Sequence, residues 1–462
     1  MAKTAIVPIN EERSFEPQEL FFSLTDRKGV IRYGNEVFTR ISGYSEEELI
    51  GEPHNIIRHP DMPRAVFKLL WDYLEAGKSI AAYVKNLAKD GRYYWVLATV
   101  TPTPTGYLSI RLKPSSPLFD AAQAVYKKAL EVEKEVERET GNRKMAMARS
   151  LEFIVGQLRA SGFDSYDHFM SEALSLEITS REKWLRDMGY QGSQRSERPG
   201  DSGLVRLVNS CDVLSGLLTS VFSSLDAFKR LGSELAGKYE MIQELAPSLQ
   251  FLALNARMAA SRLGDKGVVQ AAVADALGGK SKQAETCIVR LVDRMAPLKS
   301  ILEEQVYNIA VARFESEVAH AFATELSRAD ASSYAPLVIE SLGEVVQELA
   351  ERCRQVVAGM HSLGGETELT HRDVQSLIGY IVEMKAIQLN GKIEAASGGG
   401  KNDFSVIFDE ASRYIEVGRK DCDVLLDVLS ASAEKIEGFE QFESDLRLGI
   451  ASLQQSIGGT SA

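Results

Sequence analysis

The stretch of the 462-residue chain that is richest in reactive side chains is residues 51–63, which read GEPHNIIRHPDMP. Three prolines within eleven positions exclude a regular helix and predict a rigid, irregular turn. Two imidazoles, one guanidinium and one carboxylate stand between them, from His54, His59, Arg58 and Asp61. Such a loop can hold the polar edge of a ligand by charge-assisted hydrogen bonds. The alternative is a proline-stiffened surface loop in which Arg58 and Asp61 form a local ion pair.

An amphipathic run follows this loop at residues 64–76. Its apolar side chains recur at helical spacing and predict a helix with one apolar face, which carries Phe67, Leu70, Trp71 and Leu74. A helix next to a rigid polar loop can cover the flat face of a ligand, and Trp71 would supply an aromatic surface for it. The alternative is that Trp71 is an ordinary core residue.

Strand and helix signals on both sides of the loop indicate a small α+β domain, and this domain must position the loop. Alternating or β-rich runs predict five strands, at 21–25, 30–33, 80–88, 92–103 and 107–112. Short helices are expected at 36–42 and 45–49, and Ser45 with Glu48 has the spacing of a capping box. The Lys-Asp-Gly sequence at 89–91 is typical of a hairpin turn.

Residues of about 15 to 115 closely resemble the PAS sensor domain of bacterial aerotaxis receptors. The run Pro-His-Asn-Ile-Ile-Arg-His-Pro-Asp-Met-Pro at 53–63 is the most specific part of the likeness. Ser-Gly-Tyr at 42–44 and Asp-Gly at 90–91 are shared with many PAS domains and are weaker signals. The resemblance implies an FAD cofactor, whose redox state the domain would sense.

The resemblance also implies which side chains contact the flavin. Arg58, His59, Asp61 and Trp71 fall on the family's flavin-binding positions, with Arg58 as a charged partner for the pyrophosphate or the flavin edge and Trp71 as an aromatic face. His59 and Asp61 would set the loop geometry. We add Asn35 and Asn86 as possible hydrogen-bonding partners from the first helix and the sheet. A PAS fold without ligand and a haem held by His54 or His59 stay open as alternatives.

Composition bounds the function classes. The chain has 65 acidic and 53 basic residues, a formal charge of −12, which argues against a nucleic-acid-binding protein. No apolar run is long enough for a membrane span, and the first residues do not read as a signal peptide, so we expect a cytoplasmic protein. The four cysteines lie far apart within helical patterns and are interpreted as reduced core residues (Cys211, Cys287, Cys353 and Cys422).

Beyond residue 118 the strand signals stop and helix-forming residues dominate. A heptad pattern of apolar residues is sustained from Leu204 to Leu252 and returns near 342–360 and 422–453, which predicts coiled-coil packing. We therefore divide the chain into a flexible tail (1–14), a PAS domain (15–117), a helical connector and linker (118–200) and two helical hairpins (201–330 and 331–462).

The ends of the two hairpins both resemble the signalling tip of methyl-accepting chemotaxis proteins. In the first, Asn255 and Arg262 match the family's tip, but Ala259 stands where a glutamate is usual. In the second, Asn390 and Glu394 match, but Ser397 replaces an arginine. Each copy therefore lacks groups that in the family help to bind the kinase and its coupling protein.

Two hairpins in one chain suggest a long antiparallel four-helix bundle that forms within a monomer, a pseudo-dimer of the chemoreceptor hairpin. Its arms are expected at 203–262, 268–329, 333–397 and 404–457. A homodimer that uses the same seams is the alternative. Pro247 and Pro297 are expected to kink or break the arms, and the glycine pairs at 278–279 and 364–365 to be bends or loops.

The combined resemblance implies a non-enzymatic redox or energy sensor. The PAS domain would bind FAD, and the helical region would pass its state to the chemotaxis coupling protein, the chemotaxis histidine kinase or other chemoreceptors. The alternative is a PAS-regulated interaction or scaffold protein whose degenerate hairpins no longer control the kinase. No metal site and no nucleophile–base pair is evident in the sequence.

Overall fold

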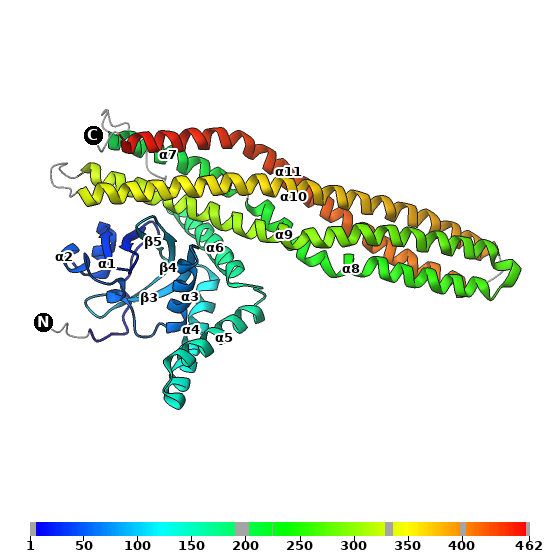
Figure 1. Cartoon of the computed structure of the whole chain (residues 1–462), viewed down its shortest axis with the longest axis horizontal. Helices are drawn as coiled ribbons and strands as arrows, with labels where there is room; N and C mark the ends of the chain where they lie inside the picture. The colour runs from blue at the N-terminus through cyan, green and yellow to red at the C-terminus, as the bar shows by residue number, and fades with distance from the viewer. Residues whose placement is uncertain (1–5, 190–202, 224, 329–335, 398–402, 459–462) are drawn as a thin grey trace. The chain divides into compact units, whose positions relative to one another are not determined.

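A computed structural model describes residues 6–189, 203–223, 225–328, 336–397 and 403–458 (Figure 1). The chain divides into two compact units that do not follow chain order. The first contains the described residues of 1–222, 306–356 and 443–462, and the second those of 223–305 and 357–442. The division passes through the long helices, so each expected hairpin contributes to both units.

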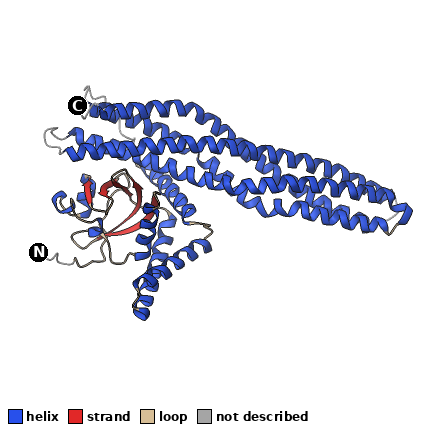
Figure 2. Ribbon diagram, viewed as in Figure 1, coloured by secondary structure: helices blue, strands red, loops and turns tan. Residues whose placement is uncertain are grey.

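The first unit is built around one antiparallel sheet with the strand order β2-β1-β5-β4-β3, drawn in red in Figure 2. The five strands lie within two residues of the predicted ranges: β1 Phe21–Asp26, β2 Ile31–Gly34, β3 Ile80–Leu87, β4 Tyr93–Pro102 and β5 Gly106–Leu112. Gly91 adopts a positive φ of 89° in the β3–β4 turn, a backbone conformation that favours glycine.

The strand register fixes which side chains share a face of this sheet. Val84 pairs with Val96, Ala98 with Arg111, and Val100 with Ser109. Because successive side chains of a strand point to opposite faces, these residues line one face, whereas Tyr83, Leu97, Thr99 and Thr101 belong to the other. The first face borders the cavity described below, and the second packs on helices.

Short helices lead from β2 to the cavity face and then to β3: α1 Glu36–Ser42, α2 Glu46–Leu49, η1 His54–Ile57 and α3 Arg64–Glu75. Ser45 and Glu48 form the predicted capping box at the start of α2. The proline-rich loop becomes the 3-10 turn η1 and a second turn, in which the Met62 amide donates to the His59 carbonyl at 3.1 Å. Helix α3 begins directly after Pro63.

Three connector helices follow the sheet: α4 Pro117–Thr140, α5 Arg143–Ala160 and α6 Tyr166–Asp187. Gly141 ends α4 with a φ of 64°. Two fully buried carboxylates attach the connector to the sheet domain. Glu133 of α4 accepts hydrogen bonds from the first backbone amides of α3, those of Arg64 and Ala65.

The second buried carboxylate, Glu177 of α6, joins three elements. It accepts hydrogen bonds from the backbone amides of Ser115 and Ser116 at 2.6 and 3.0 Å, and from the Tyr83 hydroxyl of β3 at 2.9 Å. The two amides precede α4, where backbone donors have no intrahelical acceptor. The connector is therefore held to the sheet by polar contacts as well as by apolar packing.

The remaining elements are helices, apart from the short turn η2 Gly264–Gly267. They are α7 Gly203–Ser223, α8 Leu225–Ser261, α9 Val268–Arg328, α10 Pro336–Ser397 and α11 Asp403–Gly458. Pro247 and Pro297 were expected to kink or break the arms. They lie inside α8 and α9 and end neither helix, so no break occurs there. The glycine pairs at 278–279 and 364–365 are likewise helical rather than loops. In the part of the chain that the structure describes, no helix combines the length and the apolar character that crossing a bilayer requires.

The second unit is a four-helix arrangement in which every helix contacts two others. Neighbouring helices run antiparallel, because residue numbers that rise along one helix contact residue numbers that fall along the next. The polar contacts that show this cycle are Gln250–Glu285 (α8–α9), Cys287–Asp373 (α9–α10), Gln388–Phe408 (α10–α11) and Lys238–Asp421 (α8–α11). Residues 398–402, between the expected arms 333–397 and 404–457, lie outside the described residues.

The start of the chain differs from the flexible tail expected at 1–14. The backbone amide of Ile9 donates to the Gly91 carbonyl at 2.8 Å, and the amide of Arg13 donates to the Tyr93 carbonyl at 2.7 Å. The Arg13 side chain also pairs with Asp90 at 2.7 Å. Residues 9–13 therefore cover the β3–β4 hairpin. Their sequence shows no regular alternation of apolar and polar residues, so it does not predict this contact.

Candidate ligand-binding site

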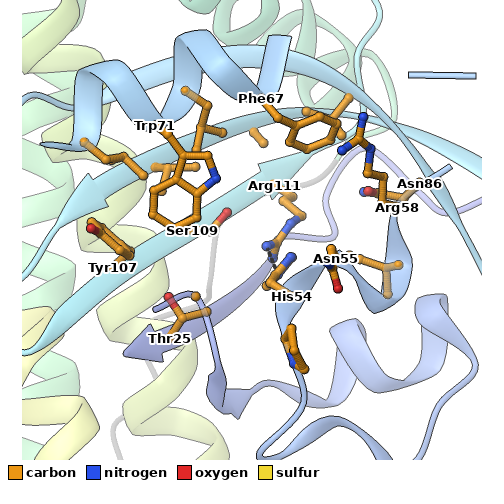
Figure 3. Close-up of a pocket in the computed structure, with 18 of the residues that line it drawn as sticks. Thr25, His54, Asn55, Arg58, Phe67, Trp71, Asn86, Tyr107, Ser109 and Arg111 are labelled. Carbon is orange, nitrogen blue, oxygen red and sulfur yellow. Dashed lines mark hydrogen bonds between the residues drawn. The ribbon is translucent and has the colours of Figure 1, made fainter. Parts of the chain in front are cut away.

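A cavity of about 260 Å³ lies between the sheet and helix α3 (Figure 3). The apolar walls come from α3 on one side and from the central strands on the other. The polar groups come from η1 and Arg58 just after it, from β1 and the turn that follows it, and from β3 and β5. Its lining side chains include Thr25, Lys28, His54, Asn55, Arg58, Phe67, Leu70, Trp71, Leu74, Val84, Asn86, Val96, Ala98, Val100, Tyr107, Ser109 and Arg111.

Arg111 on β5 is the buried charge of this cavity, with a side chain that is only 2% exposed. Its Nη2 lies 2.6 Å from Nε2 of His54 and donates to the Ser23 hydroxyl at 3.0 Å. The guanidinium also lies 5.1 Å from the centre of the Phe38 ring. Since a guanidinium is always a donor, Nε2 of His54 must be the acceptor, which places the histidine proton on Nδ1.

The electrostatics around Arg111 is unbalanced. No aspartate or glutamate is among the described residues that line the cavity, and Nη1 of Arg111 is buried without a hydrogen-bond partner in the protein. Burial lowers the pKa of Arg111 to about 10. Burial, followed by the positive charge of Arg111, lowers the pKa of His54 well below its usual value. Burying a cation without an anionic partner costs free energy. An electron-rich ligand in the cavity would offset this cost.

Arg58 stands at the end of the cavity opposite Trp71 and Tyr107 (Figure 3). Its guanidinium lies 4.1 Å from the centre of the Phe67 ring, and its Nη2 donates to the Met62 carbonyl at 3.3 Å. The backbone of Arg58 bridges to Asn86 on β3. The ion pair between Arg58 and Asp61, the alternative considered above, is not formed, because Asp61 pairs with Lys85 at 2.9 Å.

Trp71 lines the cavity from α3, as predicted from the helical spacing. Its indole meets the Tyr107 ring edge-on, at 5.6 Å between ring centres and an interplanar angle of 82°. Gly29 lies directly beneath it, and a methyl group at that position would stand 3.4 Å from the indole. The two rings form an aromatic corner against which a flat ligand can pack.

Three of the predicted contact residues do not line this cavity. Asn35 is buried as the N-cap of α1, where its side chain accepts from the amides of Phe22 and Phe38, at 3.1 and 3.2 Å. His59 is buried and points away from the cavity, with Nδ1 accepting from the Asp61 amide at 3.1 Å. Asp61 is half-exposed and faces Lys85. These side chains shape the loop and the helix, and only Arg58, Trp71 and Asn86 of the predicted set reach the cavity.

Arg111, Ser109, Tyr107 and Asn55 are polar lining residues that the sequence analysis did not name as ligand contacts. His54 was named there only as a member of the polar loop and as a possible haem ligand. The signal was available in β5, where Arg111 interrupts the apolar run Gly-Tyr-Leu-Ser-Ile-Arg-Leu at 106–112. A charged residue at an inward position of a buried strand requires a compensating group. Haem ligation suits neither histidine, because His59 lies off the cavity and Nε2 of His54 faces a guanidinium.

The predicted tip residues lie at the ends of the long helices in the second unit. Asn255 is half-buried on α8, and Arg262 is exposed just beyond its last residue. Asn390 is exposed and Glu394 half-buried on α10. Large apolar side chains next to them are also exposed, namely Phe251, Leu254, Met258, Leu389 and Ile393.

Comparison with known proteins identifies the sheet domain. Residues 31–107 match the family model described as the PAS fold. Over 110 residues the chain is 40% identical to the aerotaxis receptor of Escherichia coli (strain K12), a match that covers 23% of this chain and 22% of the receptor. Over 82 residues it is 28% identical to the biofilm dispersion protein BdlA of Pseudomonas aeruginosa, covering 18% of this chain and 20% of that protein.

Further likenesses cover a similar share of the chain. Over 95 residues the chain is 30% identical to the nitrogen fixation regulatory protein of Klebsiella pneumoniae, covering 20% of this chain and 19% of that protein. A solved LOV domain of the blue-light photoreceptor Aureochrome1 matches at 24% identity with a TM-score of 0.20, covering 22% of this chain and 88% of that one. The chain spans about a fifth of the length of the first curated relatives it matches.

Proposed function

We propose that this chain is a non-enzymatic redox sensor whose PAS domain binds FAD. The observation that carries the proposal is Arg111, a buried cation whose Nη1 has no acceptor in a cavity without described carboxylates. The carbonyl oxygens and ring nitrogens of a flavin are acceptors of the kind this group lacks. The relationship to an aerotaxis receptor supports the same ligand class.

The remaining lining fits a flat, amphipathic ring. Trp71 and Tyr107 offer aromatic surface at one end, and Val84, Val96 and Ala98 offer apolar surface from the sheet. Asn86 can donate and accept from the sheet, and Arg58 supplies a positive charge at the other end. When bound, the flavin would supply the electron chemistry, and the protein would bind, orient and read it.

A route from cavity to helices runs through adjacent residues of β4. Val100 lines the cavity, whereas the next residue, Thr101, lies on the opposite face and donates to Glu315 of α9 at 3.3 Å. Arg352 of α10 lies 3.8 Å from the same carboxylate and donates to Ser79, just before β3, at 2.7 Å. All of these groups belong to the first unit. A small movement of β4 would therefore change contacts made by the two long helices α9 and α10.

Other contacts join the same sheet face to the helices. Phe322 of α9 stacks on Tyr33 at 4.3 Å and contacts Phe22 at 5.3 Å between ring centres. Arg181 of α6 pairs with Glu317 of α9 at 2.9 Å and also donates to the Pro17 carbonyl. In our proposal, reduction of the ligand changes the charge facing Arg111, and each redox state favours one arrangement of sheet and helices.

For output, we propose that the ends of α8 and α10 bind the chemotaxis coupling protein, the chemotaxis histidine kinase or other chemoreceptors. The exposed apolar residues beside Asn255 and Asn390 support a protein-binding surface there. The closed cycle of contacts among α8 to α11 supports a pseudo-dimer formed within one chain. Light scattering on the purified protein would return the mass of a single chain, whereas an obligate dimer would contradict this part of the proposal.

An absorption spectrum of the full chain tests the input. The protein, reconstituted with FAD and desalted, should keep the two visible flavin bands and lose the longer-wavelength one on reduction with dithionite. Arg111→Gln should lose most of the retained flavin, and the exposed Arg27→Gln should not. A chain that stays colourless after reconstitution would end the proposal.

A second experiment tests the output. Full-length chain immobilised through its N-terminus should retain purified coupling protein and kinase, and Phe251→Glu should abolish that retention. Retention of neither protein by the wild-type chain would favour the alternative of an interaction or scaffold protein that no longer controls the kinase.

A further inference from the structure

A second depression, a cleft of about 480 Å³, lies between the proline-rich loop and the connector helix α4. Loop residues 55–64 form one wall. Helix α4, which lies outside the residues matched by the PAS family model, forms the other. The lining residues are Asn55, Arg58, Pro60, Met62, Arg64, Leu130, Glu133 and Lys134.

This cleft and the cavity share two lining residues. Asn55 and Arg58 line both spaces, and in Figure 3 they stand at the end of the cavity away from Trp71 and Tyr107. Small-molecule pockets typically enclose about 300–1,000 Å³, so the cavity by itself is small. A ligand that fills it and extends past Arg58 would enter the cleft.

The charges around the cleft favour an anionic group. Glu133, its acidic member, is buried and already accepts from the amides of Arg64 and Ala65, at 3.0 and 2.7 Å. Arg64 is also paired, with Glu137. By contrast, neither Arg58 nor Lys134 forms an ion pair with a described residue, although Glu133 lies near enough to Arg58, and Asp61 near enough to Lys134, to interact electrostatically. Two cations from opposite walls are therefore available to a ligand.

The cleft also has an apolar side. Met62 is buried at its base, and Leu130 of α4 is half-buried beside it. A planar base can cover such a surface while its phosphates lie near the cations. From the cavity to the cleft, the lining thus passes from the aromatic corner of Trp71 and Tyr107 to the cations Arg58 and Lys134, beside the apolar side chains of Met62 and Leu130.

We propose that the cleft binds the diphosphate–adenosine arm of the dinucleotide, with Lys134 of the connector as a phosphate contact. The inference rests on the proposed flavin ligand and deepens it. It makes helix α4 part of the binding site and predicts that the chain selects FAD over ligands that carry the same ring without the adenosine arm. It also gives the connector a direct contact with the ligand.

Titration with three ligands separates the contribution of the diphosphate–adenosine arm to the binding affinity from that of the flavin ring. The full-length apoprotein is titrated with riboflavin, FMN and FAD, and binding is followed by flavin fluorescence. The expected result is that FAD binds about tenfold more tightly than FMN, and that Lys134→Glu raises the Kd for FAD about tenfold. The same variant should leave the Kd for riboflavin within twofold of wild type, and higher salt should narrow the preference for FAD.

Lys128→Glu, an exposed position on the same helix but outside the cleft, is the matched control and should bind all three ligands as wild type does. Equal affinities of the wild-type chain for riboflavin, FMN and FAD would overturn the inference and leave the proposed flavin sensor intact. So would an equal loss of all three ligands in Lys134→Glu, because that pattern reports general damage. Failure of the wild-type chain to bind any of the three would overturn both.

Discussion

Nη2 of Arg111 lies 2.6 Å from Nε2 of His54, and the second terminal nitrogen of the same guanidinium has no partner in the protein. The two residues come from elements 57 positions apart in the chain. Their contact joins the proline-rich loop to the central strand β5. It also makes the folded domain carry a buried charge that a ligand can compensate.

The first prediction concerns Arg111 itself. Replacing it with methionine should stabilise the apoprotein, by about 1–3 kcal/mol in the free energy of unfolding, because an uncompensated buried charge is removed. The same variant should bind FAD at least tenfold more weakly, because the ring loses a charge-assisted hydrogen bond. Calorimetry and fluorescence titration measure the two effects, and Arg27→Met is the exposed control. A variant that is both less stable and unimpaired in binding would contradict the assigned role.

The second prediction concerns pH. Burial, with the nearby charge of Lys85, lowers the pKa of His59 to about 4, whereas an unfolded histidine titrates near about 6.5. Between these values the unfolded state binds more protons than the folded state, so the free energy of unfolding falls as the pH falls. One such group contributes up to about 1.4 kcal/mol per pH unit in this window.

His59→Asn should therefore flatten the dependence of Tm on pH between 5 and 6.5, measured by calorimetry on the full chain. Part of the slope will remain, because the pKa of His54 is also lowered. Parallel curves for His59→Asn and wild type would show that His59 does not titrate in this window.

The third prediction concerns the attachment of the connector. Glu177→Gln turns one of two accepting oxygens into a donor that faces hydroxyl and amide donors from Tyr83, Ser115 and Ser116. We expect a loss of about 2–4 kcal/mol in the free energy of unfolding and faster amide exchange at the start of α4. Hydrogen exchange with mass spectrometry locates the effect. Glu131→Gln, exposed on α4, should change neither quantity, and an equal effect of both substitutions would contradict a specific role for Glu177.

The fourth prediction concerns transmission. Thr101→Val preserves the shape of the side chain and removes the hydroxyl that donates to Glu315. FAD affinity should stay within twofold of wild type, because Thr101 does not line the cavity. The difference in amide exchange of residues 306–356 between the oxidised and the reduced holoprotein should shrink by at least half. Thr39→Val, on α1, is the control. A full redox response in Thr101→Val would show that the signal bypasses β4.

Local patterns were sufficient for most of the fold. The strands follow from alternation and turn residues, and the capping box of α2 follows from the spacing of Ser45 and Glu48. Heptad spacing predicts much of α8, α10 and α11. Within α8 the packing of the apolar stripe outweighs the backbone hydrogen bond that Pro247 removes. These features depend on neighbours in sequence, and a sequence displays them directly.

The site was less accessible, because its chemistry depends on residues that meet only after folding. The side chain of Asn35 has the hydrogen-bonding groups of a ligand contact. It precedes a helix, however, and its oxygen accepts hydrogen bonds from two backbone amides instead. Arg111 interrupts an apolar strand, and the sequence displays that much. Its role as a ligand contact follows only when β5 is known to be central and its inward face is known to border a cavity.

The closed cycle of contacts among α8, α9, α10 and α11 has a genetic consequence. In a bundle assembled from two identical hairpins, every substitution appears twice, and both halves must evolve together. Here the residues that meet across the bundle, such as Lys238 and Asp421, are encoded once each. The two halves are therefore free to specialise, and a single substitution at Asn255 or Asn390 alters one side of the bundle while the other stays wild type.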